Sequence, residues 1–194
     1  MTTMAQDRPR VLADLLPASL LRDVALVVGA AALTGLAAQI AIPLPFTPVP
    51  ISMQTFTVLL AGAALGPLRG GLSMALYLFA GVLGVGWFSE QRSGWEFASF
   101  GYIVGFVVAA TIVGWFARRG ADRRVLGTLA LMAVGNLVVY AIGVPWLMAS
   151  LGAGIREGIE LGVLPFLVGD GLKIALAAGI LPAAWRVLGD RRGP

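Results

Sequence analysis

The chain has 194 residues, of which 58% are hydrophobic and 12% are charged, and it contains neither Cys nor His. This composition is too apolar for an ordinary soluble domain or a disordered chain, and it excludes disulfides, thiol nucleophiles and the usual zinc or haem ligands. The net charge is +4, but the basic residues are scattered between apolar runs. A nucleic-acid partner is therefore not expected, and the chain is predicted to be an all-α integral membrane protein.

Apolar runs with few charges predict six transmembrane helices, because a bilayer requires roughly 20 residues per helix. The expected spans are 24–42, 51–66, 70–84, 97–117, 125–149 and 161–185. The first two are separated by residues 43–50, where four prolines in eight residues cannot continue a helix. Pro145 is expected to kink or end the fifth span.

The whole chain, 1–194, is predicted to form a single membrane domain. A cytoplasmic segment, 1–20, precedes a six-helix bundle at about 21–188, and a cytoplasmic tail, 189–194, follows it. No cleavable signal peptide is expected, because charged residues are spread through the first 20 residues and the first apolar run is long enough to span.

The arginines orient the bundle, since positive charge accumulates on the cytoplasmic side of a membrane protein. With six spans both termini lie on one side, and that side carries eleven arginines: Arg8, Arg10, Arg22, Arg69, Arg118, Arg119, Arg123, Arg124, Arg186, Arg191 and Arg192. The opposite side carries only Arg92 and Arg156. Both termini are therefore predicted to be cytoplasmic, with outward loops at 43–52, 85–96 and 150–163.

Asp170 and Lys173 lie three residues apart in the last span, so they project from one face of that helix. Ionisable groups inside a membrane-spanning helix pair with each other or line a polar cavity. A pair that only fixes helix packing is one interpretation. The favoured interpretation is a ligand site, because a carboxylate accepts and an ammonium donates hydrogen bonds, as a cyclic urea or amide requires.

Other polar and aromatic residues near the outer face are further candidates. Gln54 and Thr55 open the second span, and Ser99 and Tyr102 lie at the outer start of the fourth. Asn136 and Tyr140 lie four apart in the fifth span, where hydrogen bonding between helices is the simpler interpretation for Asn136. The aromatic residues Trp87, Phe88 and Trp95 suit an interfacial belt or, beside Arg92, a face toward a ligand.

Motifs for energy coupling or catalysis are missing from the sequence. There is no G-x-x-x-x-G-K-[ST] segment for ATP and no G-x-S-x-G segment or carboxylate cluster. The chain is thus expected to bind a small molecule without a cofactor, and its transport would need a partner or a gradient.

Several ordered motifs resemble the BioY family, the biotin-specific substrate-binding (S) components of energy-coupling factor (ECF) transporters. The resemblance runs from about 35 to 185 and includes Gly169-Asp170-Gly171-Leu172-Lys173, which resembles the family's D-x-x-K. Its other segments are Pro43–Thr55, Leu65–Gly71, Tyr77–Gly81 and Gly101–Phe106. The chain departs from the family at Phe97–Tyr102, where G-P-T-G-G-Y is common, at Gly86, where Pro is usual, and at Glu90–Arg92, where a Gly-rich stretch is usual. The loop between the third and fourth spans is therefore expected to have a different shape.

The resemblance implies an S-component bundle of six helices with a biotin pocket near the outer face, capped by the first outer loop and contacted by the D-x-x-K pair. It also implies two kinds of partner, a transmembrane coupling subunit (T component) and a pair of ABC ATPases. The candidate substrate-binding residues are Asp170, Lys173, Tyr102, Ser99, Gln54, Trp87 and Ser89.

The sequence as a whole predicts a multi-pass protein of the bacterial inner membrane that binds biotin and is not an enzyme. The alternatives are an S component for another vitamin, a solitary gradient-driven carrier, and a small intramembrane enzyme that uses Asp170 as a base.

Overall fold

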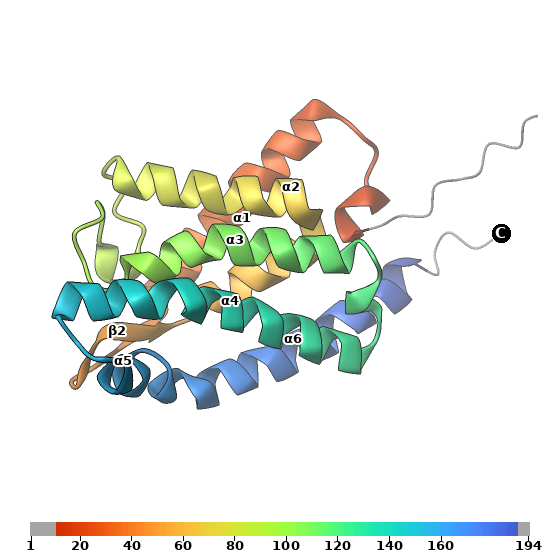
Figure 1. Ribbon diagram of the computed structural model, residues 1–194. Coiled ribbons are helices and arrows are strands. Elements are labelled where there is room, and N and C mark those ends of the chain that lie inside the picture. Colours follow the sequence, from red (N-terminus) through yellow and green to blue (C-terminus); the bar gives the residue numbers. More distant parts are fainter. Residues whose placement is uncertain (1–10, 190–194) are drawn as a thin grey trace, which may run out of the picture.

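Helices form most of residues 11–189, the part of the chain that the computed structural model describes (Figure 1). The α-helices are α1 (Leu20–Gln39), α2 (Gln54–Val82), α3 (Phe100–Ala117), α4 (Val125–Leu151), α5 (Ile155–Gly162) and α6 (Leu167–Gly189). The short 3-10 turns are η1 (Leu12–Leu15), η2 (Ser89–Gln91), η3 (Ala121–Arg123) and η4 (Leu164–Phe166), and the strands are β1 (Ala41–Leu44) and β2 (Thr47–Ser52). This largely helical architecture confirms the helical part of the predicted fold class.

Five helical stretches of the described chain are long and apolar enough to cross a bilayer. They are α1, α2, α3, α4 and the run Ile155–Leu188, which joins α5 to α6. α2 packs against both α1 and α3, and α4 packs against α3 and α6. Figure 1 shows the hairpin, η2 and α5 at one end of this bundle, with η1, η3 and the last turns of α6 at the other.

α2 reverses direction in its middle, at Gly66. This residue has φ 84° and ψ 177°, a backbone conformation open to glycine, and Pro67 follows it. Gln54 Nε2 lies 2.8 Å from Tyr77 Oη, whereas 23 residues of straight helix would span about 35 Å. The two halves, 54–65 and 67–82, therefore lie antiparallel, and the reversal falls where the sequence predicts the boundary between two spans.

The proline-rich segment forms an antiparallel hairpin, whereas the sequence predicts only an outer loop. Ile42 pairs with Ile51 and Leu44 with Thr47, with an irregular register around Pro43. Proline is tolerated in a two-stranded ribbon because its missing N–H can face the open edge. Thr47 donates from Oγ1 to the Leu161 carbonyl at 2.8 Å, which fastens the hairpin to α5.

The last outer loop also differs from its prediction, because most of residues 155–166 are helical. α5 carries an exposed Arg156–Glu160 pair at 2.8 Å, and Gly158 and Gly162 are buried beneath it. The final helix, α6, consequently begins at Leu167 rather than at 161. Pro145 does not end its helix, since α4 continues through it to Leu151.

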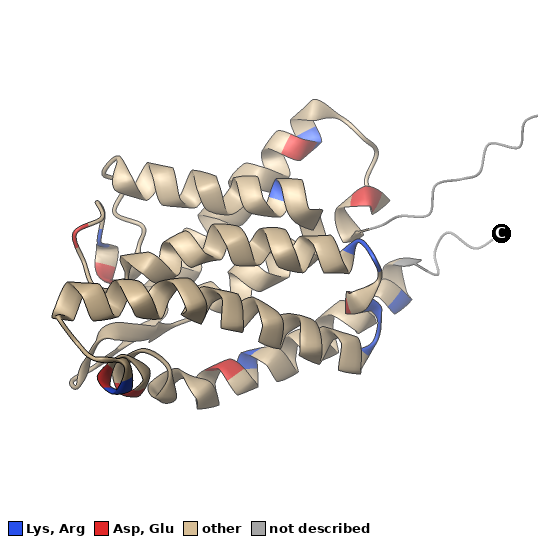
Figure 2. Cartoon of the chain, in the orientation of Figure 1, with Lys and Arg blue, Asp and Glu red and all other residues tan. Residues whose placement is uncertain are grey.

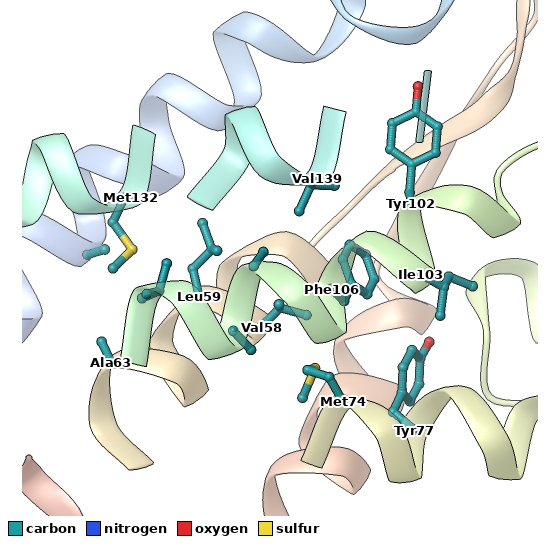
Figure 3. Packing of buried hydrophobic residues seen from close by; sticks show 14 of the residues in the cluster. Val58, Leu59, Ala63, Met74, Tyr77, Tyr102, Ile103, Phe106, Met132 and Val139 are labelled. Carbon is teal, nitrogen blue, oxygen red and sulfur yellow. The ribbon is translucent and has the colours of Figure 1, made fainter. Parts of the chain in front are cut away.

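Apolar side chains fill the space between α2, α3 and α4. Val58 and Leu59 of the first half of α2 lie with Phe106 of α3 and Val139 of α4 in one buried cluster (Figure 3). Large apolar side chains also face outward on the outer helices, such as Leu36 of α1 and Leu172 of α6. This outward apolar surface is what a bilayer requires of a spanning helix.

Charged residues gather at the two ends of the bundle, and α6 carries an acidic and a basic residue between them (Figure 2). At one end Arg69 pairs with Asp14 at 3.1 Å and with Asp23 at 3.0 Å. At the same end the buried Asp122 accepts a hydrogen bond from Trp185 Nε1 at 2.6 Å, which ties η3 to α6. The predicted cytoplasmic residues Arg8, Arg10, Arg191 and Arg192 lie outside residues 11–189, as do most of the predicted terminal segments.

Replacement of Gly114 by Ala should destabilise the fold, because α3 meets the turn of α2 at this residue. A Cβ on Gly114 would lie 2.4 Å from the carbonyl carbon of Gly66, and overpacking of this kind costs about 1–3 kcal/mol. Gly179→Ala in α6 is the matched control, because no atom lies within 4 Å of its Cβ position. We expect Gly114→Ala to lower the melting temperature in detergent and Gly179→Ala to keep or raise it; equal melting temperatures would contradict this packing.

Candidate substrate-binding cavity

A cavity of about 660 Å³, counting its open mouth, lies at the hairpin end of the bundle. The cavity is lined by residues of β2, α2, α3, α4 and α6 and of the loop around η2. The lining residues are Val49, Pro50, Ser52, Gln54, Thr55, Phe88, Ser89, Glu90, Arg92, Phe97, Ser99, Tyr102, Ile103, Phe106, Asn136, Val139, Tyr140, Phe166, Asp170 and Lys173.

Asp170 and Lys173 are the charged groups at the inner part of this cavity. Lys173 Nζ lies 3.0 Å from Asp170 Oδ1 and donates a second hydrogen bond to Thr55 Oγ1 at 2.9 Å. The Tyr140 hydroxyl donates to Asp170 Oδ2. Both charged side chains are nearly buried, with 8% of Asp170 and 11% of Lys173 exposed. A buried ion pair persists only when hydrogen bonds satisfy its remaining atoms, and Thr55 and Tyr140 supply them here.

The start of α6 explains why a carboxylate is tolerated at this depth. Because α6 begins at Leu167, Asp170 lies in its first turn. The positive end of the helix dipole stabilises an anion there. In the sequence, Asp170 falls well inside the span predicted at 161–185, so this contribution is not predicted.

Six of the seven predicted site residues line the cavity. They are Asp170, Lys173, Tyr102, Ser99, Gln54 and Ser89. Tyr102 donates its hydroxyl to the Gly162 carbonyl at 2.8 Å, so it also joins α3 to α5. Ser99 precedes α3 without using its hydroxyl as a helix cap.

Trp87 is the predicted residue that is not part of the cavity lining. Its indole Nε1 donates to the Tyr77 carbonyl at 2.9 Å, and its own carbonyl accepts from Tyr77 Oη at 3.1 Å. Gln54 Nε2 donates to that same hydroxyl. Trp87 therefore fixes the loop after α2 and, through Tyr77, orients Gln54, which does line the cavity.

Several lining residues lie outside the seven predicted substrate-binding residues. Thr55, Asn136 and Tyr140 are named from the sequence only as further candidates, although the spacing of four between Asn136 and Tyr140 places both on one face of α4. That shared face is the signal that favours a place for both in the site. Phe88, Phe97, Phe106 and Phe166 form much of the apolar wall, but an apolar residue in an apolar span carries no such signal.

The mouth of the cavity carries a second charged pair, Glu90 and Arg92. Arg92 Nη2 lies 2.6 Å from Glu90 Oε2, and its guanidinium carbon lies 5.8 Å from the centre of the Phe97 ring. Glu90 and Gln91 have φ of 62° and 57°, in the left-handed region that other residues than glycine rarely adopt. The loop that replaces the family's Gly-rich stretch is thus held in a strained conformation that presents both charges to the cavity.

The chemistry of the inner lining suits an uncharged ring with hydrogen-bonding edges that is joined to an apolar body. The inner part offers a carboxylate, an ammonium, a phenol and an amide, and the walls are aromatic and aliphatic. Among residues 11–189, no three Asp or Glu side chains gather as a metal site would require.

The chain is similar to proteins of a known family. The BioY family matches residues 4–190 of the chain. "Probable biotin transporter BioY" of Pyrococcus horikoshii is 38% identical over 159 residues, which cover 80% of this chain and 91% of that protein. "Biotin transporter BioY" of Rhizobium etli is 33% identical over 147 residues, with coverage of 71% and 78%.

A solved structure shares the fold. The S-component for biotin from an ECF-type ABC transporter superposes with a TM-score of 0.78 at 22% sequence identity, covering 86% of this chain and 92% of that one. The resemblance predicted from the sequence motifs is confirmed, because the family match spans nearly the whole chain and two relatives exceed 30% identity. The chain belongs to the BioY family.

Proposed function

We propose that this chain is the biotin-binding S component of an ECF-type transporter and that biotin occupies the cavity between α2, α3, α4 and α6. The observation that carries the proposal is the nearly buried Asp170–Lys173 pair, which lines an otherwise largely apolar cavity in a member of the BioY family. Biotin is a bicyclic molecule whose ureido ring has two N–H donors and one carbonyl acceptor. Asp170 accepts from a ureido N–H and Lys173 donates to an oxygen, while the aromatic walls contact the apolar part of the molecule.

The two charged pairs suggest which way biotin lies. The ureido ring enters first and reaches Asp170, and the valerate chain extends toward the mouth, where Arg92 meets its carboxylate. Arginine suits this role because its planar guanidinium binds a carboxylate through two parallel hydrogen bonds. In the free protein Arg92 is paired with the carboxylate of Glu90, so the carboxylate of the ligand has to displace that of Glu90.

Transport requires further parts that the chain does not supply. We propose that it crosses the cell membrane six times, with the two halves of α2 as separate spans, and that both termini are cytoplasmic. The antiparallel halves of α2 and the arginines around η3 support this topology. In the absence of a phosphate-binding loop, a T component and a pair of ABC ATPases would supply the energy, as in ECF-type transporters.

Biotin should bind the purified protein tightly, and Asp170→Asn or Lys173→Ala should weaken that binding strongly. Loss of a hydrogen bond between the ligand and a charged group costs about 1.5–3 kcal/mol, which corresponds to about 10- to 150-fold in Kd. Isothermal titration in detergent measures this directly.

The matched control for these variants is Glu160→Gln, which removes the acid of the exposed Arg156–Glu160 pair on α5. Its affinity for biotin should equal that of the wild type. Absence of biotin binding by folded wild-type protein would exclude the proposal, and a panel of other vitamins in a thermal-shift assay would then identify the ligand. Chemical conversion of bound biotin would instead indicate an enzyme, and uptake by proteoliposomes without ATPases a solitary carrier.

Arg92→Gln should weaken the binding of biotin about 10- to 150-fold, because a hydrogen bond to a charged group contributes about 1.5–3 kcal/mol. Biotin methyl ester, which lacks the negative charge, should bind wild type and variant alike. Glu90→Gln should strengthen the binding of biotin, since Arg92 then has no internal carboxylate to release. Equal losses for biotin and its ester in Arg92→Gln would show that the carboxylate lies elsewhere.

The topology can be tested by single cysteines, because the chain contains none of its own. We expect an impermeant maleimide to label Ala153→Cys in intact bacterial cells, since residue 153 lies between α4 and α5 at the hairpin end of the bundle. Thr3→Cys and Arg124→Cys should react only after permeabilisation. Labelling of all three in intact cells would contradict six spans with cytoplasmic termini.

A further inference from the structure

The amide of Asn136 is the polar group of the cavity that the pairing of Asp170 with Lys173 leaves unexplained. Asn136 is 6% exposed and lies in α4, one turn before Tyr140. Its Oδ1 is buried and accepts no hydrogen bond. In the described chain, Asp122 Oδ1 is the other buried side-chain atom in this condition, and it belongs to the opposite end of the bundle. Asn136 is thus the buried, unsatisfied acceptor that lines the cavity.

A buried acceptor without a hydrogen bond lowers the stability of a folded protein. A buried acceptor without a donor costs about 1–3 kcal/mol, and native structures contain few of them. The sequence pattern suggests a bond between helices for Asn136, but the structure gives its oxygen no such partner. An oxygen that stays unpaired at a binding site is explained if the ligand brings the donor.

The neighbours of Asn136 are already bonded to one another. Thr55, Lys173, Asp170 and Tyr140 form one continuous chain of hydrogen bonds across α2, α6 and α4. This chain uses the hydroxyl proton of Tyr140, and it directs Lys173 Nζ to Thr55 and Asp170. The Asn136 oxygen therefore receives no hydrogen bond from the groups that surround the inner part of the cavity.

We propose that Asn136 Oδ1 accepts one N–H of a bound cyclic urea while Asp170 accepts the other. This inference rests on the proposed function and assigns a second acceptor to the same site. The two N–H groups of the urea would donate to side chains of two helices, the amide of Asn136 in α4 and the carboxylate of Asp170 in α6. A ligand that lacks the donor facing Asn136 leaves a buried acceptor unpaired, and a ligand that lacks the other donor loses a hydrogen bond to Asp170. The site therefore selects for an intact urea.

A trapped water is the competing partner for this oxygen. Asn136, Thr55 and Lys173 also line a small adjoining space whose other walls are apolar side chains. A water there could donate to Asn136 in both the free and the bound protein. In that case the amide would contribute to the wall of the cavity and not to recognition of the urea.

A cycle that combines protein variants with ligand analogues separates these possibilities. The probes are biotin and two lactam analogues, each with one ureido N–H replaced by CH2, so that a donor is lost without added bulk. Titration of wild type should show both lactams binding roughly 5- to 150-fold more weakly than biotin. In Asn136→Leu the penalty should disappear for one lactam and persist for the other, whose missing N–H faces Asp170.

The control is Val139→Leu, which adds bulk to the same face of α4 and removes no polar atom. Both lactam penalties should persist in this variant. If both persist undiminished in Asn136→Leu, the proposal is overturned and the water explanation holds. Should Asn136→Leu fail to fold, Asn136→Ala is judged by the same cycle. Failure of wild type to bind biotin at all would overturn the proposed function, whereas binding without a change in either penalty overturns the role of Asn136 alone.

Discussion

A carboxylate and an ammonium three residues apart, inside a helix that otherwise faces apolar surroundings, place the strongest constraint on this structure. Neither charge can be left without partners where water is scarce, so the surrounding helices must bring polar groups to them. Thr55 comes from α2 and Tyr140 from α4, and each satisfies one side of the Asp170–Lys173 pair. The cavity exists where these three helices converge, and its hydrogen-bonding end is built around this pair.

The reversal of α2 at Gly66 makes this convergence possible. It returns the chain so that Tyr77 lies beside Gln54 and so that the first turn of α2, with Gln54 and Thr55, faces the cavity. Gly114 allows α3 to approach that turn, since a side chain there would overlap its backbone. Small residues and a glycine-specific conformation far from the cavity therefore determine the position of the polar side chains within it.

Much of the fold and part of the site could be predicted from the sequence, because a bilayer imposes simple rules. The prolines of residues 43–50 end one helix, the break between the apolar runs 51–66 and 70–84 falls at the reversal, and the D-x-x-K spacing places Asp170 and Lys173 on one face. The hairpin and α5 were missed, since short outer segments are held by particular contacts, such as that of Thr47 with Leu161, and not by periodicity. Trp87 is predicted as a site residue because of its aromatic ring. In the structure its hydrogen bonds to Tyr77 hold the loop after α2 in position.

The low charge and high apolar content by themselves determined that the protein belongs in a membrane, and the one Lys and its neighbouring Asp marked where a polar site lies. These properties depend on residue type and local spacing, which the sequence states directly. Only the tertiary structure decided that Tyr140 pairs with Asp170, that Glu90 holds Arg92 at the mouth, and that the Asn136 oxygen has no partner. Whether a buried polar atom is satisfied depends on which atoms of distant helices come within about 3 Å of it, and residue spacing along one helix carries no such information.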